Sequence, residues 1–238
     1  MFDKIANSDI NVSKQNNLYS DTGWWTLFEW NNIPRLQGSP SINICINRDD
    51  IFYKTDCHSL PQLDGPPLIL VWGSYDFEYN STVNNFRIYT DKNGRELLRE
   101  NVTNKLSKQY EYLSRIFPAK DIPKGTINIV WVGIDKKWSE FGGAAGKSAY
   151  ISNYVIDNNV VDKLSQERLL WVCGHETFHM IAPYSYPLWI SESLAQYYGY
   201  KSLSQFSSTL STPIQDWESK KHLIPNGSTG LNEAHRKV

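Results

Sequence analysis

One stretch of the sequence, HETFHMIAPYSYPLWISESLAQYYGY at 175–200, constrains the fold more than any other. The prolines inside it divide two predicted helices, one over about 163–182 and one over about 188–203. In the first helix, His175 and His179 stand four residues apart, so their imidazoles lie on one face. The stretch therefore predicts two consecutive helices, the first of which presents a pair of histidines.

These two histidines have the spacing of metal ligands. Zinc binds neutral imidazole nitrogens and carboxylate oxygens in a roughly tetrahedral shell, and a catalytic site leaves one position for water. Glu192, on the second helix, supplies a third ligand after a connection that Pro183 and Pro187 can turn back. Glu176 stands beside the metal, where a general base for that water belongs. Histidines at this spacing can instead be buried and bonded to backbone, but the third ligand favours one zinc ion per chain.

The rest of the chain predicts an α+β fold, because neither βαβ repetition nor a sandwich pattern explains the order of elements. Residues 1–66 form a predicted β-rich N-terminal portion, with strands at WWTLFEW, SINICIN and DIFYK between turn signals. Residues 67–238 form the second predicted domain. Its further predicted elements are a strand at LILVW, a helix over 95–117, a central strand over 126–134 and a glycine-led edge strand over 142–156.

Composition limits the compartments and partners. The 238 residues are 40% hydrophobic and carry a net charge of −1, which predicts a globular protein without a nucleic-acid partner. The apolar runs are too short to cross a bilayer, so we expect no membrane attachment and a cytoplasmic location, with a trimmed export signal left open. The three cysteines, Cys45, Cys57 and Cys173, do not have zinc-site spacing, and a Cys45–Cys57 bridge is left open for an exported protein. The oligomeric state is not predicted.

A second motif, GGAAGKS at 142–148, invites comparison with a phosphate-binding loop. That loop reads GxxxxGK[ST] and opens a helix. Its first glycine would have to be residue 141, which is Phe141, and the following AYISNYVI predicts a strand. We therefore do not interpret this segment as a phosphate site.

The two halves of the opening stretch together resemble the gluzincin metallopeptidases of aminopeptidase type, and most closely the glycyl aminopeptidase family. Those families carry HExxH followed by LWxxEGxxxYY, and LWISESLAQYY at 188–198 fits that form except that Ser193 replaces the usual glycine. The strong match covers about 30 residues. The resemblance implies a zincin-like domain that hydrolyses peptide bonds, with the zinc ligands and the base at the positions named above. The metzincin pattern fails, because Ala182 and Ser185 stand where its glycine and third histidine belong.

The sequence C-terminal to the third ligand departs from the family pattern in two places. Four residues on, the families carry an acid that hydrogen-bonds the first ligand histidine. Here that position is Gln196, whose carbonyl can orient His175 without adding negative charge, so we expect weaker metal binding or lower activity. The families also place a Tyr or His further along to stabilise the oxyanion, and no tyrosine follows Tyr200. His222 is the predicted oxyanion residue, with His235 the remaining candidate.

The edge strand departs from the pattern as well. In the aminopeptidase relatives it carries a Glu that captures the free amine of the substrate, whereas GGAAGKSAYI contains no acid. We still expect it to hold an extended peptide by backbone hydrogen bonds, with exo- and endopeptidase action both open. A catalytically weak or inactive zincin-fold module for metal binding or recognition is the alternative. The residues expected to contact a peptide or protein substrate are Gly142, Gly143, Ala144 and Ala145.

Overall fold

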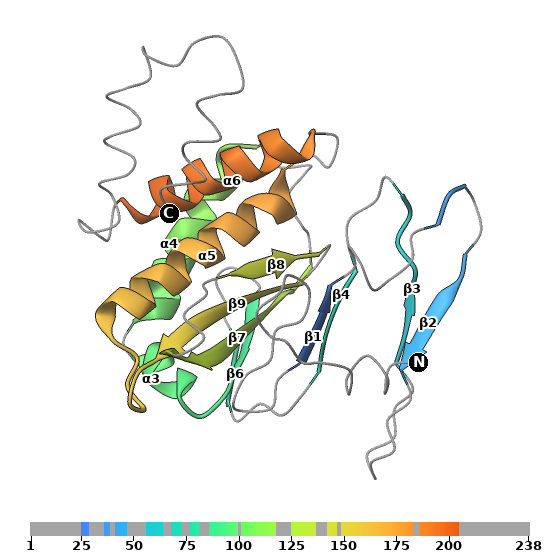
Figure 1. The fold of residues 1–238 in the computed structure, drawn as a ribbon. Coiled ribbons are helices and arrows are strands. Elements are labelled where there is room, and N and C mark those ends of the chain that lie inside the picture. The colour runs from blue at the N-terminus through green and yellow to red at the C-terminus, as the bar shows by residue number, and fades with distance from the viewer. Residues whose placement is uncertain are drawn as a thin grey trace, which may run out of the picture.

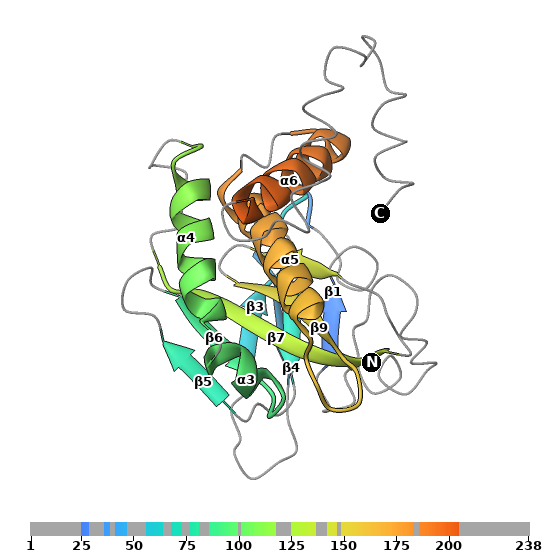
Figure 2. The ribbon, with the colours of Figure 1, turned by 90° about the vertical axis from the view of Figure 1, so that its left-hand side faces the viewer.

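The protein has an α+β fold in which a five-stranded mixed sheet separates helices from N-terminal strands. Helices α4, α5 and α6 lie on one side of the sheet and the β1–β4 pair lies on the other (Figures 1 and 2). Strand β4 contacts β9 of the large sheet. The computed structural model describes residues 25–28, 36–38, 41–46, 56–63, 68–72, 77–80, 86–99, 101–117, 125–136, 142–146, 149–182 and 186–204.

The large sheet has the strand order β5-β6-β7-β9-β8. Its three inner strands are parallel, and the two outer strands pair antiparallel. Apolar residues alternate between the faces of β7, as the two-residue period of a strand requires: Ile129 and Trp131 face the helices, and Val130 and Val132 face the other way. The strands are β5 (Phe77–Asn80), β6 (Phe86–Thr90), β7 (Ile127–Asp135), β8 (Gly143–Ala145) and β9 (Ala149–Ile156).

The prediction of a central strand over 126–134 is confirmed by β7, whereas the single edge strand predicted over 142–156 is wrong. That segment is two antiparallel strands, and only the three-residue β8 lies at the edge. The chain reverses between them, where the Gly146 N–H donates to Ala149 O at 2.8 Å. The period-two pattern alone did not indicate this reversal.

Four helices are described: α3 (Gly94–Arg99), α4 (Val102–Ser114), α5 (Lys163–Ile181) and α6 (Leu188–Leu203). The last two confirm the predicted helices, and α5 begins where Asp162 Oδ1 accepts from the Ser165 N–H at 2.6 Å. The single helix predicted over 95–117 is wrong, because α3 and α4 are separate. Asn101 has a left-handed φ of 66°, which a continuous α-helix does not allow.

Two antiparallel strand pairs lie outside the large sheet, β1 (Trp25–Phe28) with β4 (Ile69–Trp72) and β2 (Asn43–Ile46) with β3 (Asp56–Ser59). These confirm strands within WWTLFEW, SINICIN and LILVW, whereas DIFYK lies outside the described residues. A disulfide joins Cys45 to Cys57 across the β2–β3 pair. Since β1 pairs with β4, a ladder crosses the boundary predicted near residue 66, and that boundary stays a prediction. No helix in the described part of the chain is long and apolar enough to span a membrane.

Candidate metal centre

Two glycines allow α5 and α6 to lie close together. A Cβ added at Gly199 would lie 3.1 Å from His175 N and 3.2 Å from Trp171 O. A Cβ added at Gly174 would lie 2.8 Å from Ser202 Oγ and 3.2 Å from Gly199 Cα. A side chain at Gly199 would press on the backbone of α5, and one at Gly174 would come closer to Ser202 than real Cβ atoms do. The close approach is what lets a residue on α6 reach the histidines on α5.

A buried glutamine joins these two helices to α4. Gln109, 1% exposed, donates from Nε2 to Leu170 O on α5 at 3.0 Å and to Ser202 Oγ on α6 at 2.9 Å. Buried hydrogen bonds of this kind strengthen in a low-dielectric interior. The side chain of Gln109 on α4 therefore links the backbone of α5 to the side chain of Ser202 on α6.

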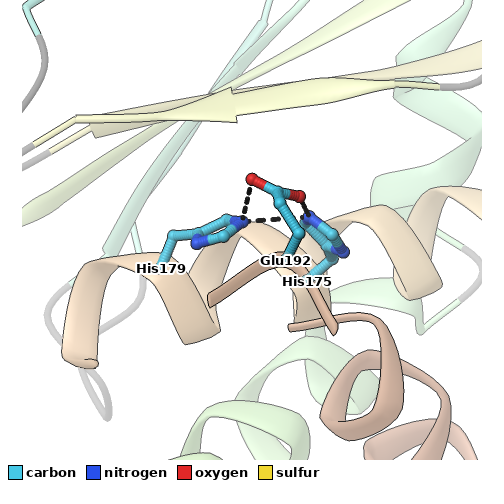
Figure 3. Close-up of side chains that lie close together, drawn as sticks. All are labelled: His175, His179 and Glu192. Atoms are coloured by element: carbon cyan, nitrogen blue, oxygen red, sulfur yellow. Dashed lines mark hydrogen bonds and ion pairs between the residues drawn. The ribbon is translucent and has the colours of Figure 1, made fainter. Parts of the chain in front are cut away.

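The three predicted metal ligands converge between α5 and α6, on the side that faces the sheet (Figure 3). The Nε2 atoms of His175 and His179 lie 3.0 Å apart. Glu192 places Oε2 3.3 Å from His175 Nε2 and Oε1 3.4 Å from His179 Nε2. One ligand atom from each residue lies within 4.8 Å of the others. Two imidazole nitrogens and a carboxylate are a donor set that zinc prefers, so these residues fit a metal ion.

The ionisable groups of the cluster shift the pKa values of one another, and the carboxylate of Glu192 supplies its negative charge. Burial alone would raise the pKa of Glu192, but hydrogen bonds with His175 and His179 and their charges hold it well below its usual value. Burial alone would lower the pKa of His179, but Glu192 and then Glu176 outweigh it and raise that pKa. Glu192 is therefore an anion at neutral pH, held next to two nitrogen donors.

Glu176 is outside this ligand group and lies against the edge strand. Its residue is 5% exposed, and a Cβ added at Gly143 of β8 would lie 2.7 Å from Glu176 Oε1. Burial raises the pKa of Glu176, the charges of His175 and His179 oppose that rise, and the Glu192 carboxylate adds to it. A buried carboxylate beside a metal-binding group has the surroundings that a general base requires.

Sequence reasoning missed one partner of the ligands. Ser191 Oγ lies 3.1 Å from Nδ1 of His179, so this hydroxyl orients the second histidine. The signal was its position directly before the third ligand on the same helix. His175 Nδ1, by contrast, is buried and has no hydrogen-bond partner among the described residues, so the bond expected from Gln196 is not formed here. The role of Gln196 stays a prediction.

The four residues expected to contact a peptide have different surroundings. Gly142 bonds within the protein, because its N–H donates to Asn153 Oδ1 at 2.8 Å and its carbonyl accepts from Asn153 N at 3.1 Å. Gly143, Ala144 and Ala145 form β8, with Gly143 next to Glu176 and Ala144 packed on the opposite face. Their contact with a substrate stays a prediction. His222 and His235 lie outside the described residues.

No model of a known protein family matches the chain, and no curated protein matches it. Among solved structures, it is similar to the aminopeptidase N family protein from Idiomarina loihiensis, with a TM-score of 0.49 and 14% identity. That similarity covers 83% of this chain and 39% of the other. The chain thus spans less than half the length of that protein.

Proposed function

We propose that the chain is a zinc-dependent peptidase with a zincin-like catalytic domain over residues 67–238. The observation that carries the proposal is the convergence of His175, His179 and Glu192, with Glu176 buried beside them against an edge strand. The first three residues would hold the metal. When bound, zinc supplies Lewis acidity toward water and toward a scissile carbonyl.

The other residues would move the proton and hold the substrate. Glu176 would take a proton from the attacking water on its carboxylate and give it to the leaving amine. Ser191 keeps the His179 ring in its orientation through Nδ1. Strand β8 ends the large sheet, so its outer edge can bind an extended peptide through backbone hydrogen bonds. A peptide or protein is therefore the substrate class that we propose.

A metal-binding module with weak or no catalysis is the second candidate. The observation that favours it is His175 Nδ1, which is buried without an acceptor in the described part of the chain. Ligand histidines ordinarily donate that proton to a carboxylate or carbonyl, and removing such partners typically costs about 10–100-fold in metal affinity or activity. Gln196, neutral where the relatives carry an acid, favours the same candidate.

Zinc content and peptide hydrolysis together test the proposal. We expect one zinc per chain, and loss of zinc in His179→Ala. Glu176→Gln should keep the zinc and lower cleavage of a mixed peptide library by about 10²–10⁴-fold, because only the base is removed. One zinc without cleavage that depends on Glu176 would support the binding module instead. No zinc in metal-replete protein would contradict both candidates.

The cellular location is a separate matter. The cytoplasmic location predicted from the sequence stays a prediction. The Cys45–Cys57 disulfide is an observation against it, because structural disulfides persist mainly in oxidising compartments.

A further inference from the structure

The edge strand β8 has one position where a side chain is missing next to the site. Successive residues of a strand point to opposite faces. Ala144 packs with Val132 and Ile151 on the face away from α5, so Gly143 and Ala145 point toward that helix. Ala145 packs into the core there, whereas at Gly143 the carboxylate of Glu176 occupies the space of a side chain.

This contact is too close to admit any other residue. A Cβ added at Gly143 would lie 2.7 Å from Oε1 and 2.8 Å from Cγ of Glu176, and 2.5 Å from Ile151 O. Real Cβ atoms essentially never approach other heavy atoms within 3.0 Å. Gly143 does not have a positive φ, so its own backbone conformation does not require glycine. The requirement comes from the close approach of Glu176 and β9.

The strand cannot easily retreat to make room. Gly143 pairs with Ser152 in the β8–β9 ladder, and the preceding residue, Gly142, makes two hydrogen bonds to Asn153. An added side chain at Gly143 would therefore press on the backbone of β9 at Ile151 as well as on Glu176, and of these two neighbours only the carboxylate of Glu176 can move at low cost.

We infer that Gly143 is a positioning residue for Glu176: its missing side chain sets where the carboxylate stands against β8. The catalytic consequence rests on the proposed function, because Glu176 is the proposed base and β8 the proposed peptide-binding edge. Strand β8 then positions both the Glu176 carboxylate and the bound peptide. A substitution in β8 would therefore alter the distance between the base and the peptide.

A thermal-stability cycle tests the contact without metal or substrate. Gly143→Ala, Glu176→Ala and the double variant are melted in the presence of a chelator. Gly143→Ala should lower Tm by at least about 2 °C more in wild type than in the Glu176→Ala background, since contacting residues do not behave additively. The matched control is Gly142→Ala, whose Cβ would meet nothing within 4 Å and whose effect should be equal in both backgrounds. Equal losses for Gly143→Ala in both backgrounds would overturn the inference.

Gly143→Ala by itself can fail to fold, because its Cβ also approaches the backbone of β9. In that case the Gly143→Ala/Glu176→Ala double variant decides. The double variant loses the contact with Glu176 and keeps the contact with Ile151 O, so it should give more soluble protein than Gly143→Ala but less than Glu176→Ala. A double variant as insoluble as the single one would overturn the inference.

Kinetics then test the catalytic consequence. Gly143→Ala should lower kcat about 10²-fold, with zinc content unchanged and a smaller change in KM, because a displacement of about 1 Å is enough for such a loss. It should cause no further loss in a Glu176→Gln background. Gly125→Ala, where a Cβ also meets nothing within 4 Å, should keep wild-type kcat. Loss of zinc, a change in KM alone, or an additive loss in Glu176→Gln would overturn the positioning role.

If wild type hydrolyses no peptide, the proposed function fails. The stability cycle still decides whether Gly143 and Glu176 interact.

Discussion

Both faces of the five-stranded sheet carry packed apolar clusters around β7 and β9, yet the two faces border different groups. On the face toward the helices, Trp131 and Tyr150 pack against α5, and polar groups enter the same layer, among them Glu176 and the Ser152–Cys173 contact of 3.2 Å. On the opposite face, an apolar cluster around Val132 includes Tyr89 and Ala144, and the buried polar residue Asn153, two residues after Ile151, bonds Gly142 away from the metal-ligand group. The strands of this sheet therefore pack into the core on both faces, but they border the candidate metal centre on the helical face only.

Strand β8 belongs to both faces at once. Ala144 is packed in the cluster around Val132, whereas Gly143 borders Glu176. The packing of Ala144 on the face away from α5 therefore fixes the position of β8 next to Glu176. The predictions below separate the contributions of the two faces.

The largest expected effect is on the core of the helical face. Trp131 is fully buried, so Trp131→Ala should lower the free energy of unfolding by about 3–5 kcal/mol. Val132→Ala on the other face should cost about 2 kcal/mol, because fewer buried apolar atoms are removed. Urea unfolding measures both, with the exposed Leu164→Ala as the control that changes little. Equal costs at 131 and 132, despite the difference in side-chain size, would show that the face of Val132 contributes more stability per buried atom than the helical face.

Zinc should stabilise the protein through the helical face alone. At free zinc about 100-fold above its Kd, ligand binding adds about 2.7 kcal/mol, or about 5–10 °C in Tm for a chain of this size. A chelator should reverse the gain, and His179→Ala should abolish it. His58→Ala, which changes a histidine outside the ligand group, should respond to zinc as wild type does. A zinc response that survives in His179→Ala would place the metal elsewhere.

Separating α5 from α6 by a substitution is expected to have a smaller effect on stability. Gly174→Ala puts a Cβ 2.8 Å from Ser202 Oγ and 3.0 Å from Gln109 Nε2, so the helices must separate slightly. We expect a loss of about 1–3 kcal/mol in stability, as for other overpacked cores, together with weaker zinc affinity because Glu192 moves away from the histidines. Calorimetric titration with zinc measures the affinity. Unchanged affinity would show that the ligands tolerate the helix shift.

Removal of the disulfide is expected to have the smallest effect, which is on zinc affinity. The β2–β3 pair lies across the large sheet from α5 and α6 (Figure 1). Removing the bridge with Cys45→Ser and Cys57→Ser should therefore change zinc affinity by less than about twofold, as expected of distant, independent sites. A larger change would mean that the N-terminal portion supports the site through the sheet.

Helices and strands with strong local patterns were predictable from the sequence. The bounds of α5 and α6 and the position of β7 follow from periodicity and from proline at the helix ends. The separation of α3 from α4 was not predictable in this way, because a left-handed asparagine leaves the apolar spacing on either side unchanged. The pairing of β4 with β1 was also missed, since a strand pattern does not name its partner.

The sequence by itself determined the donor set, because a helical spacing of four residues puts His175 and His179 on one face, and the motif after them supplies Glu192. Tertiary structure alone decided that these groups meet, through the glycines that bring α5 close to α6. It also decided that Ser191 orients His179 and that Glu176 stands against Gly143. Local patterns encode which face a side chain takes along its own element. Contacts between elements depend on how the whole chain packs, and no local pattern records them.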